Sequence, residues 1–252
     1  HSMFSKFDVI IMDEASMIPL PAVYYASALA KESVVISGDF RQLSPIVTSK
    51  EKAILDEIGS DIFFKAGIQE AFENKTGLKR TVLLNTQYRM PDNVCRLISP
   101  RMYRSELLTE YKSSPAEMPE PFNSNLVVID TSSLNPFVNK KGGSKYNLLN
   151  AVLARNICSR LNESKFTGSI GVCTPYAAQR DLINKLLQAD NLEEKIESGT
   201  VHRFQGDEKD VVLFDVPDSY GEHYVGAFAQ AELPSDSGSK LFNVAVSRSK
   251  GN

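Results

Sequence analysis

Short apolar segments alternate with segments of helical spacing along most of the chain. The first apolar run lies within residues 7–16, is rich in Val and Ile, and is too short to span a membrane. These properties are typical of a strand buried inside a parallel sheet. Further strands are predicted at residues 33–37, 81–84, 126–130, 169–173 and 210–216. Helices are predicted at residues 15–30, at 50–73 with breaks near Gly59 and Gly67, from Pro91 onward, and at 146–161, 174–188 and 241–250. Strands that alternate with helices on this scale predict an α/β fold with parallel sheets.

Four segments are turn-rich or lack periodicity and are predicted to be linkers or loops. Residues 74–77 are polar and lie between two apolar patterns, so we expect a hinge between two domains there. The other three segments are residues 113–125, 135–143 and 217–239. The chain is therefore predicted to divide into residues 1–77 and 78–252.

The composition is that of an ordinary globular protein. The chain has 252 residues, of which 42% are hydrophobic and 23% charged, and its formal net charge is −3. No global positive field indicates nucleic acid, although local basic clusters inside a cleft can suffice. The three cysteines are scattered without CxxC spacing, which favours reduced core residues over disulfides or a zinc site. With no signal peptide and no apolar run near 18 residues, we expect a cytoplasmic protein.

Two adjacent carboxylates, Asp13 and Glu14, follow the first apolar run. In doubly wound α/β sheets, chemistry collects outside the carboxyl ends of the strands. An Asp at that edge is well placed to hold Mg²⁺, and an adjacent Glu to polarise a water molecule against a phosphate. Alone, the pair favours a strand followed by an acidic helix cap, and the rest of the chain reverses that preference.

Four more polar clusters stand at the ends of predicted elements. Together with Asp13-Glu14-Ala15-Ser16 they form an ordered set: Gly38-Asp39 with Gln42 and Pro45, Gln87-Tyr88-Arg89, residues 200–208, and residues 243–250. In combination, order and spacing this set resembles motifs II to VI of superfamily 1 helicases. The Gln-Tyr-Arg-Met and Phe-Gln-Gly sequences point to the group that includes nonsense-decay helicases and DNA-replication helicase-nucleases.

This resemblance covers nearly the whole chain, from about Phe7 to Lys250. It implies a RecA-like P-loop NTPase core built on parallel sheets. Residues 1–77 would be the C-terminal part of a first RecA-like domain, and residues 78–252 a complete second one. The implied activity is ATP-driven movement along one strand, with 5′ to 3′ polarity by resemblance only.

The resemblance assigns catalytic roles to five residues, with ATP and Mg²⁺ as cofactors. Asp13 would bind Mg²⁺ through water, and Glu14 would orient and deprotonate the attacking water. Gln42 would sense the γ-phosphate. Arg89 and Arg248 would be arginine fingers, a role that suits the planar and permanently charged guanidinium. As an alternative, both arginines could form ordinary surface ion pairs.

Further residues would contact ATP through its base, ribose and phosphates. By the family pattern Tyr88 stacks on the base, Gly206 approaches the phosphates through its backbone, and Glu208 accepts from the ribose hydroxyls. Two alternatives remain open: Tyr88 could be a core aromatic, and Asp39 could cap a turn instead of belonging to the phosphate loop. His202 and Arg203 receive no role.

Single-stranded nucleic acid, DNA or RNA, is the implied partner, and neither a membrane nor a second copy of the chain is expected. Thr174, Pro175 and Tyr176 resemble the segment of the second domain that touches the nucleic-acid backbone, and Thr200 resembles the motif V contact. Hydroxyls and backbone amides hold phosphates without reading sequence, and an aromatic ring offers a stacking platform. Thr174-Pro175 also fits a plain helix start. The basic segment at residues 140–145 fits a solvated loop.

The sequence contains no GxxxxGK[ST] phosphate-binding loop. Without it, no backbone amides and no lysine cradle the β- and γ-phosphates. We therefore expect the C-terminal portion of a larger helicase, which alone hydrolyses little ATP. The alternatives are a non-catalytic helicase-like module that binds nucleic acid or a partner, and an ATPase of another kind, such as a restriction or repair enzyme.

Overall fold

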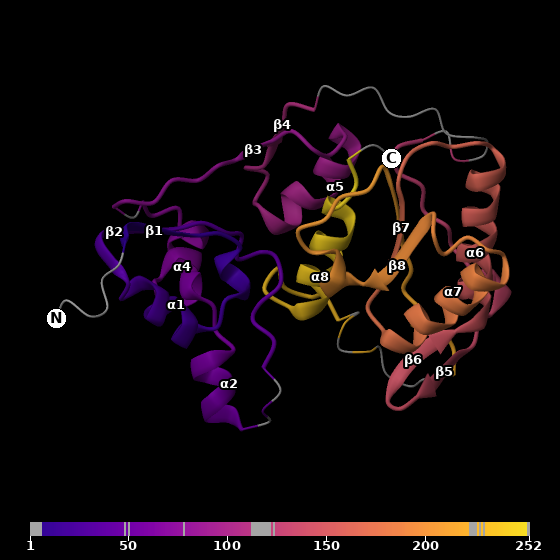
Figure 1. Ribbon diagram of the computed structural model, residues 1–252, viewed down its shortest axis with the longest axis horizontal. Coiled ribbons are helices and arrows are strands. Elements are labelled where there is room, and N and C mark those ends of the chain that lie inside the picture. Colours follow the sequence, from indigo (N-terminus) through magenta and orange to yellow (C-terminus); the bar gives the residue numbers. More distant parts are fainter. Residues whose placement is uncertain are drawn as a thin grey trace. The chain divides into compact units, whose positions relative to one another are not determined.

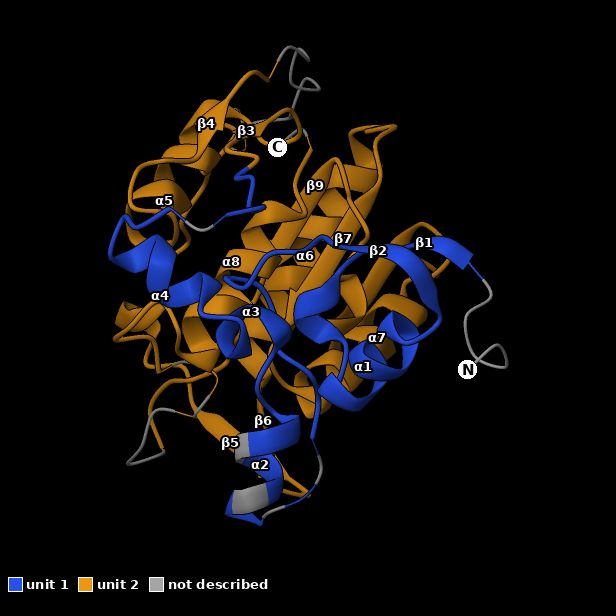
Figure 2. Cartoon of the chain, turned by 90° about the vertical axis from the view of Figure 1, so that its left-hand side faces the viewer, with its two compact units in different colours: residues 1–83 blue, residues 84–252 orange. Residues whose placement is uncertain are grey.

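The chain divides into two compact units, residues 1–83 and residues 84–252 (Figure 2). The computed structural model describes residues 7–47, 49, 51–77, 79–111, 122, 124–221, 226, 228 and 230–250 (Figure 1). Most of the predicted loop at residues 113–125 and part of the one at 217–239 lie outside these residues. Within the described residues, no helix has the length and apolar character needed to cross a membrane.

Unit 1 contains a pair of parallel strands followed by three short helices. Strand β1 (Phe7–Met12) pairs with β2 (Ala30–Ile36), and a 3-10 turn η1 (Ala15–Met17) and helix α1 (Leu20–Ser27) connect them. The predicted single helix at residues 15–30 was wrong, because Pro19 and Pro21 restrict the start of α1 and β2 already begins at Ala30. Helices α2 (Lys52–Ile58), α3 (Ile62–Lys65) and α4 (Ile68–Glu73) confirm the helical segment with its two glycine breaks.

The two strands of unit 1 are more exposed than expected. Met12 is buried, but Ile11 is 71% exposed and Val35 48%. The prediction of a buried strand is therefore wrong for most of β1. The reason is that this sheet has only two strands in the described part of the chain, whereas parallel strands are normally covered on both faces.

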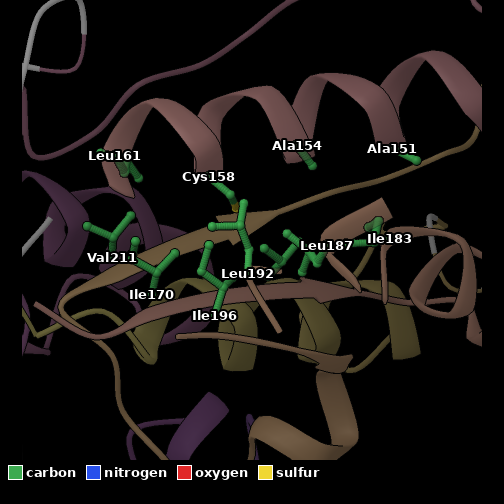
Figure 3. Close-up of a cluster of buried hydrophobic side chains, with 11 residues drawn as sticks. Ala151, Ala154, Cys158, Leu161, Ile170, Ile183, Leu187, Leu192, Ile196 and Val211 are labelled. Atoms are coloured by element: carbon green, nitrogen blue, oxygen red, sulfur yellow. The ribbon is translucent and has the colours of Figure 1, made fainter. Parts of the chain in front are cut away.

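Unit 2 is built on a parallel sheet with strand order β8-β7-β9. Strand β7 (Ile170–Thr174) is central and buried throughout, and β9 (Val211–Phe214) and β8 (Ile196–Thr200) flank it. Helices α6 (Leu148–Glu163) and α7 (Ala177–Ala189) contribute one side of the core. Figure 3 shows side chains of α6, such as Ala154 and Cys158, directed at this cluster. These parallel strands confirm the predicted α/β class.

The second face of this sheet holds a large aromatic ring. Phe204 belongs to the 3-10 turn η3 (Val201–Phe204) and is fully buried. A Cβ atom at Gly171 would lie 2.6 Å from the Phe204 ring, and one at Gly199 would lie 2.9 Å from it. These two glycines in adjacent strands leave the space that the ring fills.

A smaller part of unit 2 packs around the last helix. Strand β3 (Thr86–Gln87) pairs in parallel with β4 (Leu108–Thr109), and helix α5 (Asp92–Met102) contacts α8 (Ser237–Ser247). Their apolar contact consists of buried residues of α5 and the segment before it, with Phe242 and Val246 from α8. This contact fixes the segment that carries Tyr88 and Arg89.

Several predicted elements between residues 81 and 147 need correction. Residues 81–84 and 126–130 form no strand, because their backbones pair with no neighbouring strand. The predicted loop at residues 135–143 is mostly a hairpin of β5 (Val138–Lys141) and β6 (Ser144–Asn147). Its turn uses Gly142 and Gly143 at φ values of 56° and 81°, which glycine adopts readily. Helix α6 starts after Asn147, whose side chain accepts a hydrogen bond from the Asn150 amide, and not at residue 146.

Candidate active site

The acid pair of unit 1 lies at the carboxyl end of β1, and both side chains are exposed. Glu14 has the left-handed backbone conformation, with φ 50° and ψ 36°, and its amide donates to Asp13 Oδ1 at 2.9 Å. For a non-glycine residue this conformation costs about 1–2 kcal/mol, and such strain collects at functional sites. Glu14 occupies the N-cap position of η1 but makes no side-chain capping hydrogen bond there.

The end of β2 lies directly beside the acid pair. The Ala15 amide donates to Ser37 O at 2.9 Å, and the Ser37 amide donates to Met12 O at 2.8 Å. A Cβ atom at Gly38 would lie 2.8 Å from the Ala15 nitrogen, and the φ of Gly38 is 155°. The predicted motifs II and III therefore meet at one edge of the sheet, and only glycine fits that approach.

Asp39 organises the turn that carries Gln42. Its carboxylate accepts from the Arg41 amide at 2.8 Å and from Gln42 Nε2 at 3.1 Å. This geometry matches the turn-cap alternative for Asp39. Arg41 is buried, forms an ion pair with Glu73 and lies over the ring of Phe40, so it anchors the turn from the inside.

In unit 2, a glutamine shapes the turn of the Gln-Tyr-Arg-Met segment. Gln87 Oε1 accepts from the amides of Arg89 and Met90 at 2.8 and 2.7 Å, and its Nε2 donates to Met90 O at 2.8 Å. Tyr88 is 68% exposed, so the core alternative for Tyr88 is wrong. Our sequence reasoning gave Gln87 no role, although its place at the head of the motif was a signal.

A glutamate joins the two ends of the predicted site in unit 2. Arg89 Nε donates to Glu208 Oε2 at 3.0 Å, and Lys250 Nζ lies 3.6 Å from Glu208 Oε1. Residues 89, 208 and 250, which are far apart in sequence, therefore meet at the surface. Gly206 lies two positions before Glu208 in a turn with φ 82°, and nothing lies within 4 Å of the position a Cβ would take.

Arg248 lies inside unit 2 and is only 2% exposed. Its Nε donates to Val244 O at 3.2 Å, its Nη1 to Asp207 O at 3.4 Å and its Nη2 to Ser247 Oγ at 3.0 Å. This burial differs from the exposed side chain expected of an arginine finger. It also excludes the surface ion-pair alternative for Arg248.

Backbone contacts connect the segments of Asp207 and Arg248. The Lys209 amide donates to Arg248 O at 3.0 Å, and the Lys250 amide donates to Lys209 O at 2.9 Å. Lys209 Nζ lies 2.8 Å from Glu197 and 2.9 Å from Asp207. Hydrogen bonds to these two carboxylates raise the pKa of Lys209, and the hydrogen bond from Lys209 lowers the pKa of Asp207.

The predicted nucleic-acid contacts lie together but are mostly covered. Thr174 and Thr200 pair at the carboxyl ends of β7 and β8. Thr174, Pro175 and Tyr176 are all buried, and Thr200 is half-buried. The Tyr176 ring packs edge-on against Phe228 at 5.7 Å, and burial raises its pKa. These three side chains are therefore covered in the described structure, and their contact with nucleic acid stays a prediction.

Sequence reasoning missed a buried polar network behind this strip. Gln179 Nε2 donates to Asp215 Oδ2 at 2.5 Å, and Asn150 Nδ2 donates to Asp215 Oδ1 at 3.0 Å. Gln179 also accepts from the Asn147 amide at 2.8 Å. Burial raises the pKa of Asp215. The only sequence signal of this network is Gln179, a glutamine one helical turn after Tyr176. The network holds the start of α7 in place.

The predicted site residues fall in two places. Asp13, Glu14 and Gln42 lie in unit 1, and all the others lie in unit 2. His202 is half-buried, burial lowers its pKa, and the geometry gives it no chemical role. Among the described residues no group of three or more His, Cys, Asp or Glu side chains could hold a metal ion.

Comparison with known proteins identifies relatives along the whole chain. The family described as "AAA domain" matches residues 66–252. The chain is 28% identical over 270 residues to the DNA polymerase alpha-associated DNA helicase A of Saccharomyces cerevisiae, covering 97% of this chain and 37% of that protein. It is 30% identical over 239 residues to the helicase sen1 of Schizosaccharomyces pombe, covering 90% of this chain and 13% of that protein.

A third relative comes from the helicase-nuclease group. The chain is 30% identical over 282 residues to the DNA replication ATP-dependent helicase/nuclease dna2 of Schizosaccharomyces pombe, covering 99% of this chain and 18% of that protein. These matches confirm the resemblance to superfamily 1 helicases. The chain spans less than two fifths of the length of each of these three relatives.

Proposed function

Because the chain belongs to the AAA domain family, we propose that it forms part of an ATP-dependent superfamily 1 helicase that moves along single-stranded DNA or RNA. The observation that carries this proposal is the acid pair of unit 1. Asp13 and Glu14 stand exposed at the carboxyl end of a parallel strand, on a strained backbone and beside the Gly38 turn. Carboxylates at the carboxyl end of a parallel strand lie where α/β sheets collect their ligands.

Mg²⁺ fits the acid pair as an ion that protein and substrate would coordinate together. Asp13 offers hard carboxylate oxygens, one of which accepts from the Glu14 amide. Because no larger acidic cluster surrounds it in the described part of the chain, most of the remaining ligands would be water and phosphate oxygens, which Mg²⁺ prefers. When bound, Mg²⁺ supplies positive charge to the phosphates. Glu14 would take the proton of the attacking water.

Unit 2 would supply the nucleotide contacts that do not involve Mg²⁺. Tyr88 is exposed for stacking on the base, and Arg89 is partly exposed for the phosphates. Glu208 holds Arg89 in the described structure, so ribose binding by Glu208 and phosphate binding by Arg89 would both require this ion pair to open. Gly206 lies in a turn with free space around it, as an approach by phosphates requires.

Catalysis by this chain alone is not part of the proposal. The sequence has no GxxxxGK[ST] loop, and the exposed apolar side chains of β1 and β2 are those of a sheet that further strands or helices would cover. We propose that the whole protein supplies the phosphate loop and that the chain by itself hydrolyses little ATP.

A second candidate is a non-catalytic helicase-like module that binds nucleic acid or a partner. The burial of Arg248 favours it, because an arginine finger must reach the phosphates. Retention of Asp13, Glu14, Gln42 and Arg89 favours the enzyme, since a binding module has no use for this set.

The deciding experiment measures ATP turnover stimulated by dT and rU oligonucleotides. It compares the chain alone with the chain joined to the coding sequence that precedes it. We expect turnover only in the extended protein, and its loss in the Glu14→Gln variant. Glu32→Gln, which changes an exposed acid of β2, is the matched control. No turnover in the extended protein, together with retained oligonucleotide binding, would favour the binding module.

A further inference from the structure

The hairpin of β5 and β6 is a fixed element of unit 2. Ser144 Oγ accepts from the Ala178 amide at 3.0 Å, in the first turn of α7. Asn147 exchanges two hydrogen bonds with the Gln179 side chain. Because α7 starts directly after Tyr176, these contacts hold the hairpin beside the covered strip of Thr174, Pro175 and Tyr176.

A buried ion pair ties strand β6 of the hairpin to Asp218. Lys145 Nζ lies 2.5 Å from Asp218 Oδ1, and the two side chains are 6% and 10% exposed. Asp218 Oδ1 also accepts from the Gly226 amide at 2.9 Å. The negative charge of Asp218 is therefore neutralised inside the fold and does not face the surface of the hairpin.

Residues 219–221 continue the hairpin as a third extended segment. Phe137 and Tyr220 form a parallel β-bridge, and the Val138 amide donates to Tyr220 O at 2.8 Å. Ser219 Oγ donates to Pro136 O at 2.7 Å. The Phe137 ring packs over Gly221, where a Cβ atom would lie 2.6 Å away. Phe137 and Tyr220 are thus held side by side from segments over 80 positions apart.

The outer face of this element carries aromatic and basic side chains. Phe137 is 62% exposed and Tyr220 is 57% exposed, while Val138 between the exposed positions is buried. Strand alternation places Asn139 and Lys141 on the same face as Phe137, and both are exposed. Lys140 is also exposed, but the same alternation turns it to the opposite side of β5, next to the hairpin turn. We name Phe137, Asn139, Lys141 and Tyr220 the hairpin face, and Lys140 flanks it.

We propose that the hairpin face binds single-stranded nucleic acid, with Phe137 and Tyr220 stacking on bases and the lysines contacting phosphates. Exposed rings next to lysines suit this ligand, because every base has a face for stacking and every phosphate a negative charge. The hairpin is anchored to the first turn of α7, directly after the covered strip, and its face offers exposed contacts that Thr174 to Tyr176 lack. This inference rests on the proposed function. It identifies the hairpin face as a surface that binds the single strand along which the helicase would move.

The test measures binding of fluorescent dT and rU 15-mers to the chain. We expect Phe137→Ala and Tyr220→Ala each to weaken binding by at least about fivefold, the loss of one stacked base, and Phe137→Tyr to bind as wild type. Changing Lys140 and Lys141 together to alanine should reduce the slope of log affinity against log salt by about 1.4. Leu134→Ala, an equally exposed apolar side chain nearby, and Lys185→Ala, an exposed lysine of α7, should change neither quantity.

The possible outcomes separate this inference from the proposed function. Wild-type binding that survives all hairpin-face variants would overturn the hairpin face as the binding surface and leave the proposed function standing. A wild-type chain that binds neither oligonucleotide would contradict both. Equal thermal melting midpoints for wild type and variants exclude unfolding as the cause of a loss, and Phe137→Tyr distinguishes stacking from packing.

Discussion

Arg89 and Glu208 form an ion pair at 3.0 Å across 119 positions of sequence, and it joins the Gln-Tyr-Arg-Met turn to the end of the Phe-Gln-Gly segment. Both side chains remain over 40% exposed, so the pair contributes at most about 1 kcal/mol to stability. Because the pair is weak, a phosphate could replace Glu208 as the partner of the Arg89 guanidinium at little cost in free energy.

We therefore expect Arg89→Ala to affect chemistry and not folding. In the extended protein it should lower kcat by about 10³-fold or more, as loss of an arginine finger does. In the chain alone it should change the free energy of unfolding by less than about 1 kcal/mol. Steady-state ATPase assays and urea unfolding measure the two effects. Arg96→Ala, which removes an exposed i,i+4 ion pair with Asp92, is the control and should change neither.

The opposite result is expected for Arg248→Ala. The buried guanidinium donates to Val244 O, Asp207 O and Ser247 Oγ, so its removal ends three hydrogen bonds and leaves a cavity. The chain should lose about 2–4 kcal/mol in the free energy of unfolding, measured by urea titration. If unfolding is unchanged while ATPase activity of the extended protein is lost, Arg248 acts as an exposed finger and its buried position is not its working position.

Gly38→Ala should destabilise unit 1. The added Cβ atom would lie 2.8 Å from the Ala15 nitrogen, and the φ of 155° is unfavourable for alanine. We expect a loss of about 1–3 kcal/mol. Gly77→Ala is the matched control, because nothing lies within 4 Å of its Cβ position and its φ is not positive. Its effect should lie between zero and about 1 kcal/mol of stabilisation. Equal effects of the two substitutions would contradict the close approach of the two strand ends.

The buried carboxyl group of Asp215 should make stability depend on pH. Burial raises its pKa in the folded protein, so the folded state holds the proton more tightly than the unfolded state does. Its contribution is present below the ordinary value of 3.8 and is lost as pH rises through the folded pKa. In that window, wild type should lose up to about 1.4 kcal/mol per pH unit relative to Asp215→Asn.

Urea unfolding of wild type and Asp215→Asn at half-unit steps from pH 4 to 7 measures this difference. Exposed acids such as Asp207, whose pKa is lowered, contribute equally to both proteins and cancel. Parallel stability curves for the two proteins would show that Asp215 titrates as it does in the unfolded chain.

The local sequence pattern was enough to predict those strands and helix breaks whose formation depends on neighbouring residues. The runs around β1, β7 and β9 and the helix breaks at Gly59 and Gly67 followed from the sequence, because periodicity and backbone restriction act within a few residues. The acid pair was also placed correctly at a strand end. Strand β8 was missed, since Ile196–Thr200 is short and carries glycine and polar residues. It is a strand because β7 pairs with it.

The motifs by themselves determined that this chain resembles superfamily 1 helicases, because residue identity and order along the chain carry that information. Only the tertiary structure decided which motif side chains are exposed and can contact a ligand. Arg248 and Tyr176 are buried while Arg89 and Tyr88 are exposed. Burial is decided by segments that arrive from far along the chain, such as Asp218 on Lys145 and Asp207 beside Arg248. Those approaches depend on packing free energy across the whole unit, which no local pattern records.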